Sequence, residues 1–302
     1  MPNNIASELQ IDDILGTVME AFREKIPSFN LFSTGFTPEL KGTDKVQVPY
    51  YPLVRDAAEV TSHNPATGYP KTSTSDTETR EVVIDQNKLI NLSVSDLEAS
   101  RQPQLRPDIL LRRKGQNLAE QILADVLGLV TAANFAEQVG PYAANAFFVD
   151  DLQDIDTKCD ELEWDKNLRG LILNHAYDGN LLKDNSFHQD AYGANDAIKT
   201  ATLPNVRGFD IASTRYIPDN GENLVGMAVH PSAILLGFAP VPPQRMKNVE
   251  AYQTIEDPDG SGLTLEYKEI YDADLKILHR YIECNYGRAF AEKNGIVRIV
   301  SA

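Results

Sequence analysis

The chain has 302 residues, which is enough for one large domain or two ordinary ones with a real apolar core. Hydrophobic residues make up 42% and charged residues 24%, values close to the globular average, so collagen-like, coiled-coil and globally disordered classes are excluded. The 28 basic and 44 acidic residues give a net charge of −16, which argues against a protein that grips nucleic-acid phosphates through its overall electrostatic field.

Cysteine usage and the absence of targeting signals favour a soluble protein made in the cytosol. Cys159 and Cys284 are far apart and neither has a second cysteine nearby, so buried thiols in a reducing compartment are the simplest interpretation. Residues 1–10 lack the basic start and apolar run of a secretory signal. No apolar stretch approaches the roughly 18 residues of a membrane span, so no membrane partner is predicted.

The N-terminal segment predicts an amphipathic helix over residues 7–26, ended by Pro27. Its apolar side chains recur at spacings of three and four and form one stripe. That stripe can pack on the chain's own domain or on a neighbouring chain, and the pattern does not distinguish the two. The stripe comprises Ile11, Ile14, Leu15, Val18, Met19, Phe22 and Ile26.

Two β-rich segments, residues 45–54 and 79–95, flank a long polar connection. Residues 55–78 are dominated by Thr, Ser, Pro, Asn and Gly and offer almost nothing to bury. A connection this long without a core is usually a lid, a binding arm or a linker. We interpret it as a two-stranded arm that reaches another subunit, because an isolated hairpin is only marginally stable in water. A loose surface loop is the alternative.

Residues 107–134 predict the longest helix of the chain. Pro107 and Asp108 suit its first turn, because a proline there loses no hydrogen bond and an acid lies at the positive end of the helix dipole. Aliphatic residues follow on one face as far as Asn134, while arginine, lysine and glutamine occupy the other faces. A helix of this length spans about 40 Å, so we expect it to run along an extended molecule.

The remainder mixes helices and strands without βαβ regularity, which predicts the α+β class. Aspartates at 150, 151, 154 and 156 favour a helix N-terminus, and calcium binding is the weaker alternative because no glycine turn or distal glutamate follows. Residues 135–145 are expected to be irregular, and Pro231 is expected to open a short helix over 232–238. Strands are predicted at 171–174, 208–214, 224–230, 263–271, 275–284 and 296–300.

No motif for catalysis, cofactor binding or metal binding is found. The five histidines form no HxxxH or HExxH pair, and His230 is better interpreted as a helix cap. Residues 257–260 begin like a calcium loop, but Lys268 occupies the position of its distal glutamate, so a turn is the better interpretation. We therefore predict no catalytic residue, no cofactor and no metal. An enzyme whose groups converge only in space is an alternative.

The order of these features resembles the major capsid protein of tailed bacteriophages, which has the Hong Kong 97 fold. An N-terminal helix, a long polar two-stranded loop, a long helix, a mixed central region and final antiparallel strands follow one another over most of the chain. Residues 108–134 look like the spine helix of that family. Shorter resemblances to its axial-domain strands and helix, and to turns that close its peripheral domain, are carried by 208–211, 228–233, 271–272 and 286–289.

The resemblance implies four segments. These are an N-terminal arm with an amphipathic helix (1–42), an extended β-hairpin loop (43–95), a peripheral domain with the spine helix (96–149 and 245–302) and an axial domain (150–244). It also implies a structural protein, not an enzyme, that self-assembles as hexamers and pentamers into an icosahedral head shell. That shell would enclose double-stranded phage DNA, and the subunits would be made in the bacterial host cytoplasm before they enter the virion.

Further partners implied by the resemblance are scaffold, portal and decoration proteins. The chain starts almost at once with the N-arm, so we expect a separate scaffold or none, and no removal of the N-terminus. Some relatives cross-link a lysine of the extended loop to a distant asparagine. Lys71 and Lys88 lie in or beside the loop, but no partner can be assigned, and we predict no such bond.

Contacts between subunits are the only sites that we predict. They are assigned to the helix stripe, the arm and the bases near the long helix, namely Ile14, Val18, Phe22, Tyr50, Tyr51, Tyr69, Lys71, Arg101, Arg112 and Arg113. These arginines, with Arg106 and Lys114, are expected to pair with acids of the same domain or of neighbouring chains. An encapsulin-like nanocompartment shell that packages a protein cargo shares the fold and is the first alternative; an α+β enzyme working as a small oligomer is the second.

Overall fold

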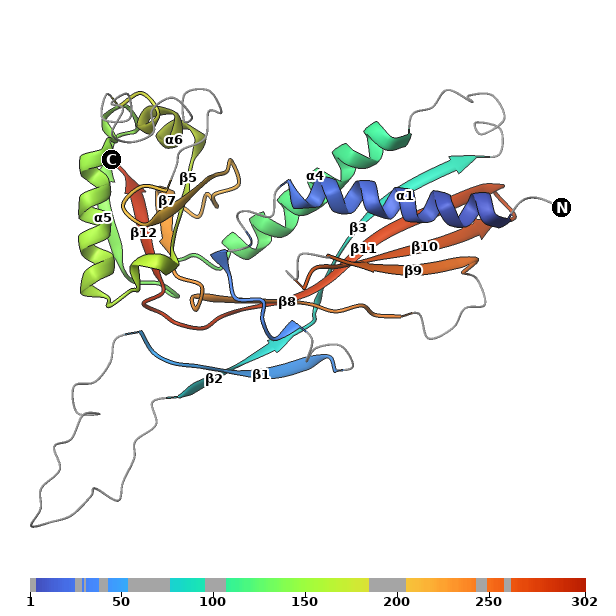
Figure 1. Ribbon diagram of the computed structural model, residues 1–302, viewed down its shortest axis with the longest axis horizontal. Coiled ribbons are helices and arrows are strands. Elements are labelled where there is room, and N and C mark those ends of the chain that lie inside the picture. Colours follow the sequence, from blue (N-terminus) through green and yellow to red (C-terminus); the bar gives the residue numbers. More distant parts are fainter. Residues whose placement is uncertain are drawn as a thin grey trace, which may run out of the picture. The chain divides into compact units, whose positions relative to one another are not determined.

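The computed structural model describes residues 4–24, 29, 31–37, 43–53, 77–95, 107–184, 205–242, 249–257 and 262–302. Contacts divide the chain into two compact units, each built from three separate stretches of sequence (Figure 1). The first unit contains Met1–Val46, Val82–Val126 and Leu235–Ala289. The second unit contains Gln47–Glu81, Leu127–Ile234 and Phe290–Ala302.

The first unit is built on a long antiparallel sheet with strand order β3-β11-β10-β9. These strands are β3 (Gln86–Ser95), β11 (Ile277–Phe290), β10 (Thr264–Asp272) and β9 (Ala251–Glu256), and β8 (Ile234–Phe238) also pairs with β11. Tyr267 and Cys284 of the central strands are fully buried on one face, whereas Leu89 on the other face of β3 is exposed; Glu266 and Asn285, on that other face of the central strands, are also buried. One face of the sheet therefore carries the core of this unit.

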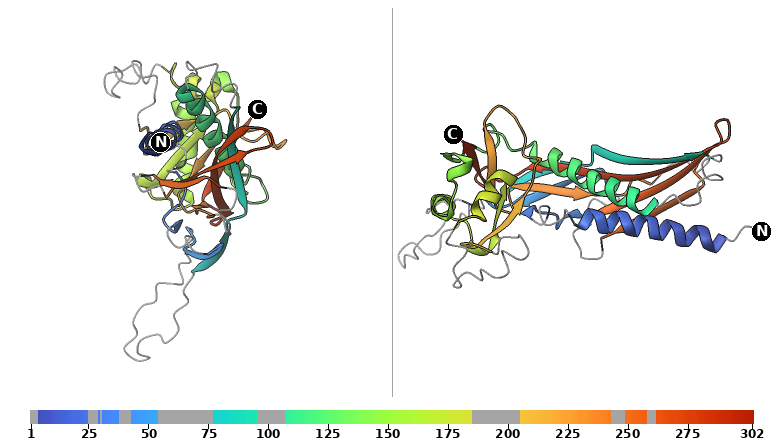
Figure 2. Two further views of the ribbon diagram at one scale, coloured as in Figure 1. Left: turned by 90° about the vertical axis from the view of Figure 1, so that its right-hand side faces the viewer. Right: turned by 90° about the horizontal axis from the view of Figure 1, so that it is seen from above.

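Two helices cover that unit, α1 (Asn4–Arg23) and α4 (Pro107–Leu127). Both run along the strands of the sheet (Figure 2). From α1, Leu15 and Val18 are fully buried, and from α4, Leu118 and Ile122 are buried in the same way. The apolar stripe that the sequence predicts in each helix thus becomes the layer between helix and sheet.

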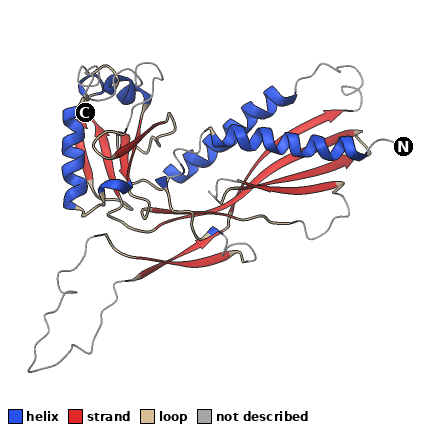
Figure 3. Ribbon diagram, in the orientation of Figure 1, coloured by secondary structure: helices blue, strands red, loops and turns tan. Residues whose placement is uncertain are grey.

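The second unit contains a five-stranded sheet with strand order β4-β12-β7-β5-β6. The strands are β4 (Gln138–Tyr142), β12 (Ile296–Ser301), β7 (Leu224–Val229), β5 (Arg169–Leu173) and β6 (Phe209–Ser213). β12 and β5 pair with β7 in antiparallel fashion, whereas the two outer strands run parallel to their neighbours. Figure 3 shows this sheet beside the helices α5 (Val149–Glu161) and α6 (His175–Leu181).

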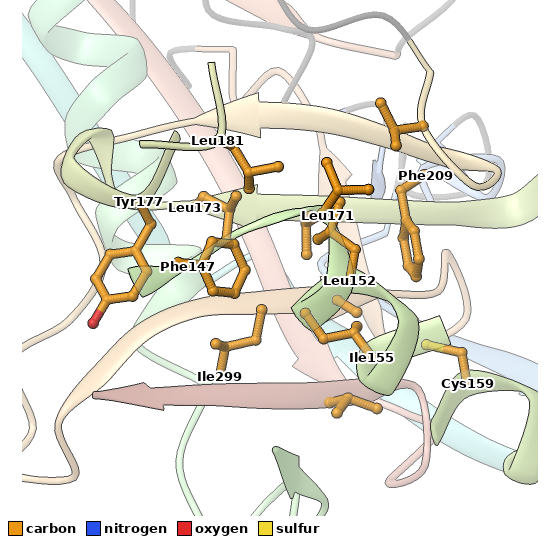
Figure 4. Close-up of a cluster of buried hydrophobic side chains, with 14 of the residues drawn as sticks. Phe147, Leu152, Ile155, Cys159, Leu171, Leu173, Tyr177, Leu181, Phe209 and Ile299 are labelled. Carbon is orange, nitrogen blue, oxygen red and sulfur yellow. The ribbon is translucent and has the colours of Figure 1, made fainter. Parts of the chain in front are cut away.

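The core of the second unit lies between this sheet and α5. Leu152, Ile155 and Cys159 of α5 point toward Leu171 and Ile299 of the sheet, and all five are fully buried (Figure 4). Every residue of β5 is buried, and Leu171, Ile172 and Leu173 form its continuous apolar part. Phe147 and Tyr177 close one end of the cluster, with ring centroids 5.4 Å apart in an edge-to-face arrangement.

A separate two-stranded ribbon is formed by β1 (Lys45–Tyr50) and β2 (Glu78–Val83). Short 3-10 turns at Ala144–Ala146 and Lys166–Leu168 complete the described elements. The α+β class is confirmed, because an antiparallel sheet, a mixed sheet and helices are combined without repeated βαβ units. Among the described residues, no helix is both long and apolar enough to cross a membrane.

Several predicted elements differ from the structure. Residues 234–238 form the strand β8 and not a helix; their side chains are buried throughout, and periodicity cannot tell a short buried strand from a buried helix. The long helix ends at Leu127 and not at Asn134, because the chain turns there and the Asn134 side chain donates to the Leu129 carbonyl at 2.8 Å. Strand β4 lies in the segment that was expected to be irregular.

A further difference concerns the boundary of an element. The segment 79–95 is divided between β2 and β3, which belong to different sheets. In the contact units, residues 127–149 and 290–302 group with the central part of the chain and not with α4 and β9–β11.

Candidate assembly surfaces

The predicted N-terminal stripe packs within its own unit. Val18 is 0% exposed and Phe22 is 1% exposed, and Ile14 is half-buried. α1 crosses α4 at Gly115, where an added Cβ would lie 3.2 Å from both the Val18 Cγ1 and the Val18 carbonyl oxygen. Val18 and Phe22 therefore contribute to the core of the chain, which corrects their assignment to a surface that contacts a neighbour.

Polar side chains of α4 hold the end of α1. The Glu24 carboxylate, just after α1, forms an ion pair with Arg112 and accepts a hydrogen bond from Gln116 Nε2 at 2.6 Å. Arg112 and Gln116 are one turn apart on α4, so both reach the same carboxylate. Lys114 donates to the Asn91 carbonyl of β3, and Arg113 is exposed. Arg112 thus pairs with an acid of the same unit, as one form of the charge prediction expects, whereas the partner of Lys114 is a backbone carbonyl and not an acid.

The β1–β2 ribbon has one buried and one exposed tyrosine at its end. The Tyr50 hydroxyl donates to the Glu78 carboxylate, and burial, with that hydrogen bond, raises the pKa of Tyr50 to about 12. Gln47 Nε2 donates to Glu81 at 3.0 Å across the same ribbon. Tyr51 is 75% exposed, the largest exposed fraction among the large hydrophobic side chains that the structure describes. An exposed aromatic ring can bury a large apolar area against a partner, and a two-stranded ribbon gains stability from such a contact.

The base of the ribbon is fixed by backbone contacts. The Ile84 N–H donates to the Asp44 carbonyl at 2.9 Å. Gly287 of β11 lies directly against Val83, so that an added Cβ would overlap the Val83 carbonyl oxygen and lie 2.7 Å from its carbon. The passage from β2 to β3 over β11 thus needs a residue without a side chain at 287.

Three predicted contact residues, Tyr69, Lys71 and Arg101, lie outside the described residues, as does Arg106. The same holds for 54–76, most of the polar connection.

Other exposed apolar side chains were not predicted as contacts. They occur in both units, and a monomer normally shows such residues singly and not in large patches. Leu89 was recognisable in principle, since the alternation of β3 places it on the face opposite the core. Leu275, which is 65% exposed, follows Asp274 in a tight turn and gives no signal in the pattern. The exposed set comprises Val83, Leu89, Phe148, Leu168, Val241, Tyr271 and Leu275.

Two of the four aspartates in the acidic cluster of the sequence lie at a helix N-terminus, as predicted, and the other two lie within the helix. Asp150 and Asp151 occupy the first turn of α5, and the Asp151 carboxylate accepts the Phe148 N–H at 2.7 Å. Asp156 and Asp160, further along α5, bind the buried guanidinium of Arg169 from β5. The hydrogen bond from Arg169 lowers the pKa of Asp160 below its ordinary value. These acids orient and anchor α5 on the sheet.

The described residues offer little reactive chemistry. No group of three or more His, Cys, Asp or Glu side chains there could hold a metal ion. Burial raises the pKa of Cys159 to about 12 and raises that of Cys284 still further from its ordinary range. His230 caps a turn before β8 and not a helix; its Nδ1 lies 2.8 Å from Ser232 Oγ, and burial lowers its pKa.

No family model matches the chain, and no curated protein matches it in sequence. Solved structures match it well in fold. A structure from Mycobacterium phage Che8 is 16% identical with a TM-score of 0.61, and 89% of each chain is covered. The capsid of the cyanophage P-SCSP1u is 13% identical with a TM-score of 0.56, covering 87% of this chain and 84% of that one. A virus-like particle from Pyrococcus furiosus is 11% identical with a TM-score of 0.53, covering 94% and 96%.

These likenesses extend over nearly the whole chain and include the mature capsid of bacteriophage PhiM1, with a TM-score of 0.53. At such low identity they establish the fold and not the details of any site. The chain has the Hong Kong 97 fold of tailed-phage capsid proteins, as its order of elements predicts.

Proposed function

We propose that this chain is a major capsid protein that self-assembles into the icosahedral head shell of a tailed phage. The observation that carries the proposal is the fold match over 86–89% of the chain to a Che8 phage structure and the P-SCSP1u and PhiM1 capsids. Those capsids are assembled shells, and a fold kept over 86–89% of the chain at 10–16% identity supports a shared architectural role.

The chain's surface supports self-association. The β1–β2 ribbon has only two strands, and such a ribbon needs support from another surface to be stable. Tyr51 stands bare at its end, and tyrosine is among the residues that most often dominate interface energies. We assign the contacts between subunits to Ile14, Tyr51 and Arg113, together with Tyr69, Lys71 and Arg101. Copies of this chain would meet as hexamers and pentamers, each contact repeated by symmetry.

The four-segment division is part of the proposal. Residues 1–42 act as the N-terminal arm, 43–95 as the extended loop, 96–149 and 245–302 as the peripheral domain and 150–244 as the axial domain. The contact units, which place 127–149 and 290–302 with the central part of the chain, favour moving these two stretches to the axial domain.

Double-stranded DNA is the content that we propose for the shell. A net charge of −16 opposes tight binding to phosphates, so the DNA would be held by enclosure and weak local contacts. Subunits would be made in the bacterial host cytoplasm and end in the virion, and scaffold, portal and decoration proteins would be additional partners.

A shell that packages a protein cargo is the second candidate. It is favoured by the virus-like particle from Pyrococcus furiosus, which matches 94% of this chain. The two candidates share the assembly and differ in what is enclosed. The net charge of −16 is compatible with enclosed DNA and with an enclosed protein cargo.

The test is expression of the full chain, followed by sedimentation, electron microscopy and nuclease treatment of the purified particles. A closed shell of megadalton mass supports self-assembly, and a small oligomer overturns it. Expression in infected host cells then distinguishes the contents: nuclease-resistant DNA of genome length supports the phage capsid, and a co-purifying protein without DNA supports the cargo shell. Empty particles formed by the chain alone support self-assembly into a shell. The sample from infected cells then shows what the shell encloses.

A further inference from the structure

We propose that Asn220 is a site of spontaneous deamidation in the folded protein, and that Asn294 is protected from the same reaction. The sequence contains two Asn-Gly pairs, Asn220–Gly221 and Asn294–Gly295. Asn-Gly is the pair most open to this reaction, because glycine has no side chain to block the approach of its own nitrogen. The structure places the two pairs in opposite environments.

The reaction needs only water. The backbone nitrogen of the glycine attacks the asparagine Cγ and loses its proton; the new C–N bond forms, the bond from Cγ to Nδ2 breaks, and ammonia leaves. Water then opens the resulting five-membered succinimide at either carbonyl and gives aspartate or isoaspartate. An amide is thus exchanged for a carboxylate without oxidation or reduction.

Asn220 is arranged for the first step. Asn220 and Gly221 are both exposed in the turn between β6 and β7. Asn220 Oδ1 accepts the Glu222 N–H at 3.2 Å, which folds the side chain back over the Gly221 peptide that lies between the two residues. Within the described part of the chain, the Gly221 N–H makes no hydrogen bond, and no heavy atom lies within 4 Å of a Cβ built on Gly221. The nucleophilic nitrogen is therefore free to move toward Cγ.

The leaving amide is held only loosely. Asn220 Nδ2 donates to the Val130 carbonyl and to Glu222 Oε2, each at 3.2 Å, which is the long end of the hydrogen-bond range. Of these two acceptors, Val130 is buried and Glu222 is partly exposed, so water can replace the Glu222 carboxylate when the amide leaves.

Asn294 is fixed on several sides. The Gly295 N–H, which would be the nucleophile, donates to the Glu292 carbonyl at 3.0 Å. The Asn294 N–H donates to Glu292 Oε1 at 2.9 Å, and the Asn294 carbonyl accepts the indole N–H of Trp164 at 2.9 Å. Gly295 also packs tightly, since an added Cβ would lie 2.8 Å from the Ala233 Cα. Succinimide formation there requires this turn to open first.

Conversion at 220 would change the local charge balance. Glu222 accepts the Ala132 N–H at 3.0 Å and pairs with Arg298 at 2.9 Å, and Arg298 is almost fully buried. A carboxylate at 220 would face the Glu222 carboxylate and the Val130 carbonyl, the two acceptors that Asn220 Nδ2 now satisfies. Two attractive contacts become repulsive, so the aged protein should unfold at a lower temperature.

The test compares both pairs in one sample. Full-length protein is incubated at neutral and mildly alkaline pH, once native and once in urea, and time points are digested with trypsin. Peptides 216–245 and 294–298 are then followed by mass spectrometry, with fragmentation to separate Asn220 from Asn223. Asn223 is the control within the peptide, because leucine follows it. Asn220→Gln is the control variant, since a glutamine at 220 cannot form the five-membered ring.

The native protein should convert Asn220 at least about tenfold faster than Asn294, because several hydrogen bonds must open at the second pair. In urea the difference should largely disappear. Equal native rates at the two pairs, faster conversion at Asn294, or an Asn220 that stays an amide while the unfolded chain converts would each overturn the proposal.

Discussion

Gly287 of β11 and Val83 of β2 touch through their backbones, with no room for a side chain between them. We predict that Gly287→Ala lowers the free energy of unfolding by about 2–4 kcal/mol, because backbone on both sides prevents relaxation. Gly16→Ala is the matched control: nothing lies within 4 Å of an added Cβ there, and alanine in α1 should stabilise by roughly 0.5–1 kcal/mol. Urea titration measures the free energy of unfolding of both variants. A Gly287→Ala chain as stable as the original would contradict the backbone contact between residues 287 and 83.

Arg169→Ala should be among the most damaging single changes in the second unit. Its guanidinium is buried and binds Asp156, Asp160 and the Trp164 carbonyl, so its removal leaves the nearly buried Asp156 carboxylate without its cation. The expected loss is about 3–5 kcal/mol. Adding Asp156→Asn to Arg169→Ala should recover part of it, as measured by denaturant unfolding. A double variant no more stable than the single one would show that lost packing, and not the unpaired charge, is responsible.

Acid should weaken the Asp160 contact in a defined pH range. The hydrogen bond from Arg169 lowers the pKa of Asp160 below 3.8, so the carboxylate contributes stability above the unfolded-state pKa. That contribution is lost as the pH falls through the lower folded-state value, below pH about 4. Asp160→Asn removes the titrating group, so the variant's stability should fall less steeply there. Unfolding curves at several acidic pH values measure the difference, and parallel curves for the two proteins would refute it.

Neither cysteine should react in the native protein. Cys159 and Cys284 are fully buried, and burial raises both thiol pKa values, Cys159 to about 12. The thiolate, which is the reactive form, is therefore scarce at neutral pH. A thiol reagent should label no cysteine in buffer and both in urea. Fast labelling of either residue in buffer would show that its unit opens easily.

Tyr51 tests the assembly proposal directly. Because it is 75% exposed, Tyr51→Ser should leave the unfolding temperature of the unassembled chain nearly unchanged while it reduces shell formation. Tyr51→Phe keeps the ring and should assemble almost normally. Sedimentation of the three proteins at equal concentration gives the answer, and full assembly by Tyr51→Ser would remove Tyr51 from the contact set.

How much of this could be read from the sequence depends on what each pattern encodes. The apolar stripe on α1 predicts that Val18 and Phe22 are buried, but it does not predict which surface buries them. The structure shows that they are buried within the first unit of the same chain. Strands β5, β7 and β10 were recognisable from continuous or alternating apolar residues. β8 was not, because five buried residues fit a strand or a helix equally well.

The role of charged residues near a helix end was predicted more reliably than the position of surface contacts. The aspartates at the start of α5 act on the nearest backbone, so their role follows from neighbouring positions. Tyr51 and Leu275 are exposed because no other part of the chain that the structure describes packs over them. Such packing depends on residues that can lie anywhere in the chain, so neighbouring positions do not predict it. The pattern predicts a turn at 286–289, but these residues lie within β11, and the close approach of Gly287 to Val83 is brought about only by the fold.

Strand β12 follows every other strand of its sheet in the chain, yet it occupies an inner position, paired with β4 on one side and β7 on the other. A polypeptide that stops before residue 296 leaves both neighbours without their shared partner, and Ile296, Val297 and Ile299 are absent from the core. Incomplete translation products therefore cannot close this sheet. The sheet of the second unit is therefore complete only once residues 296–301 have been synthesised.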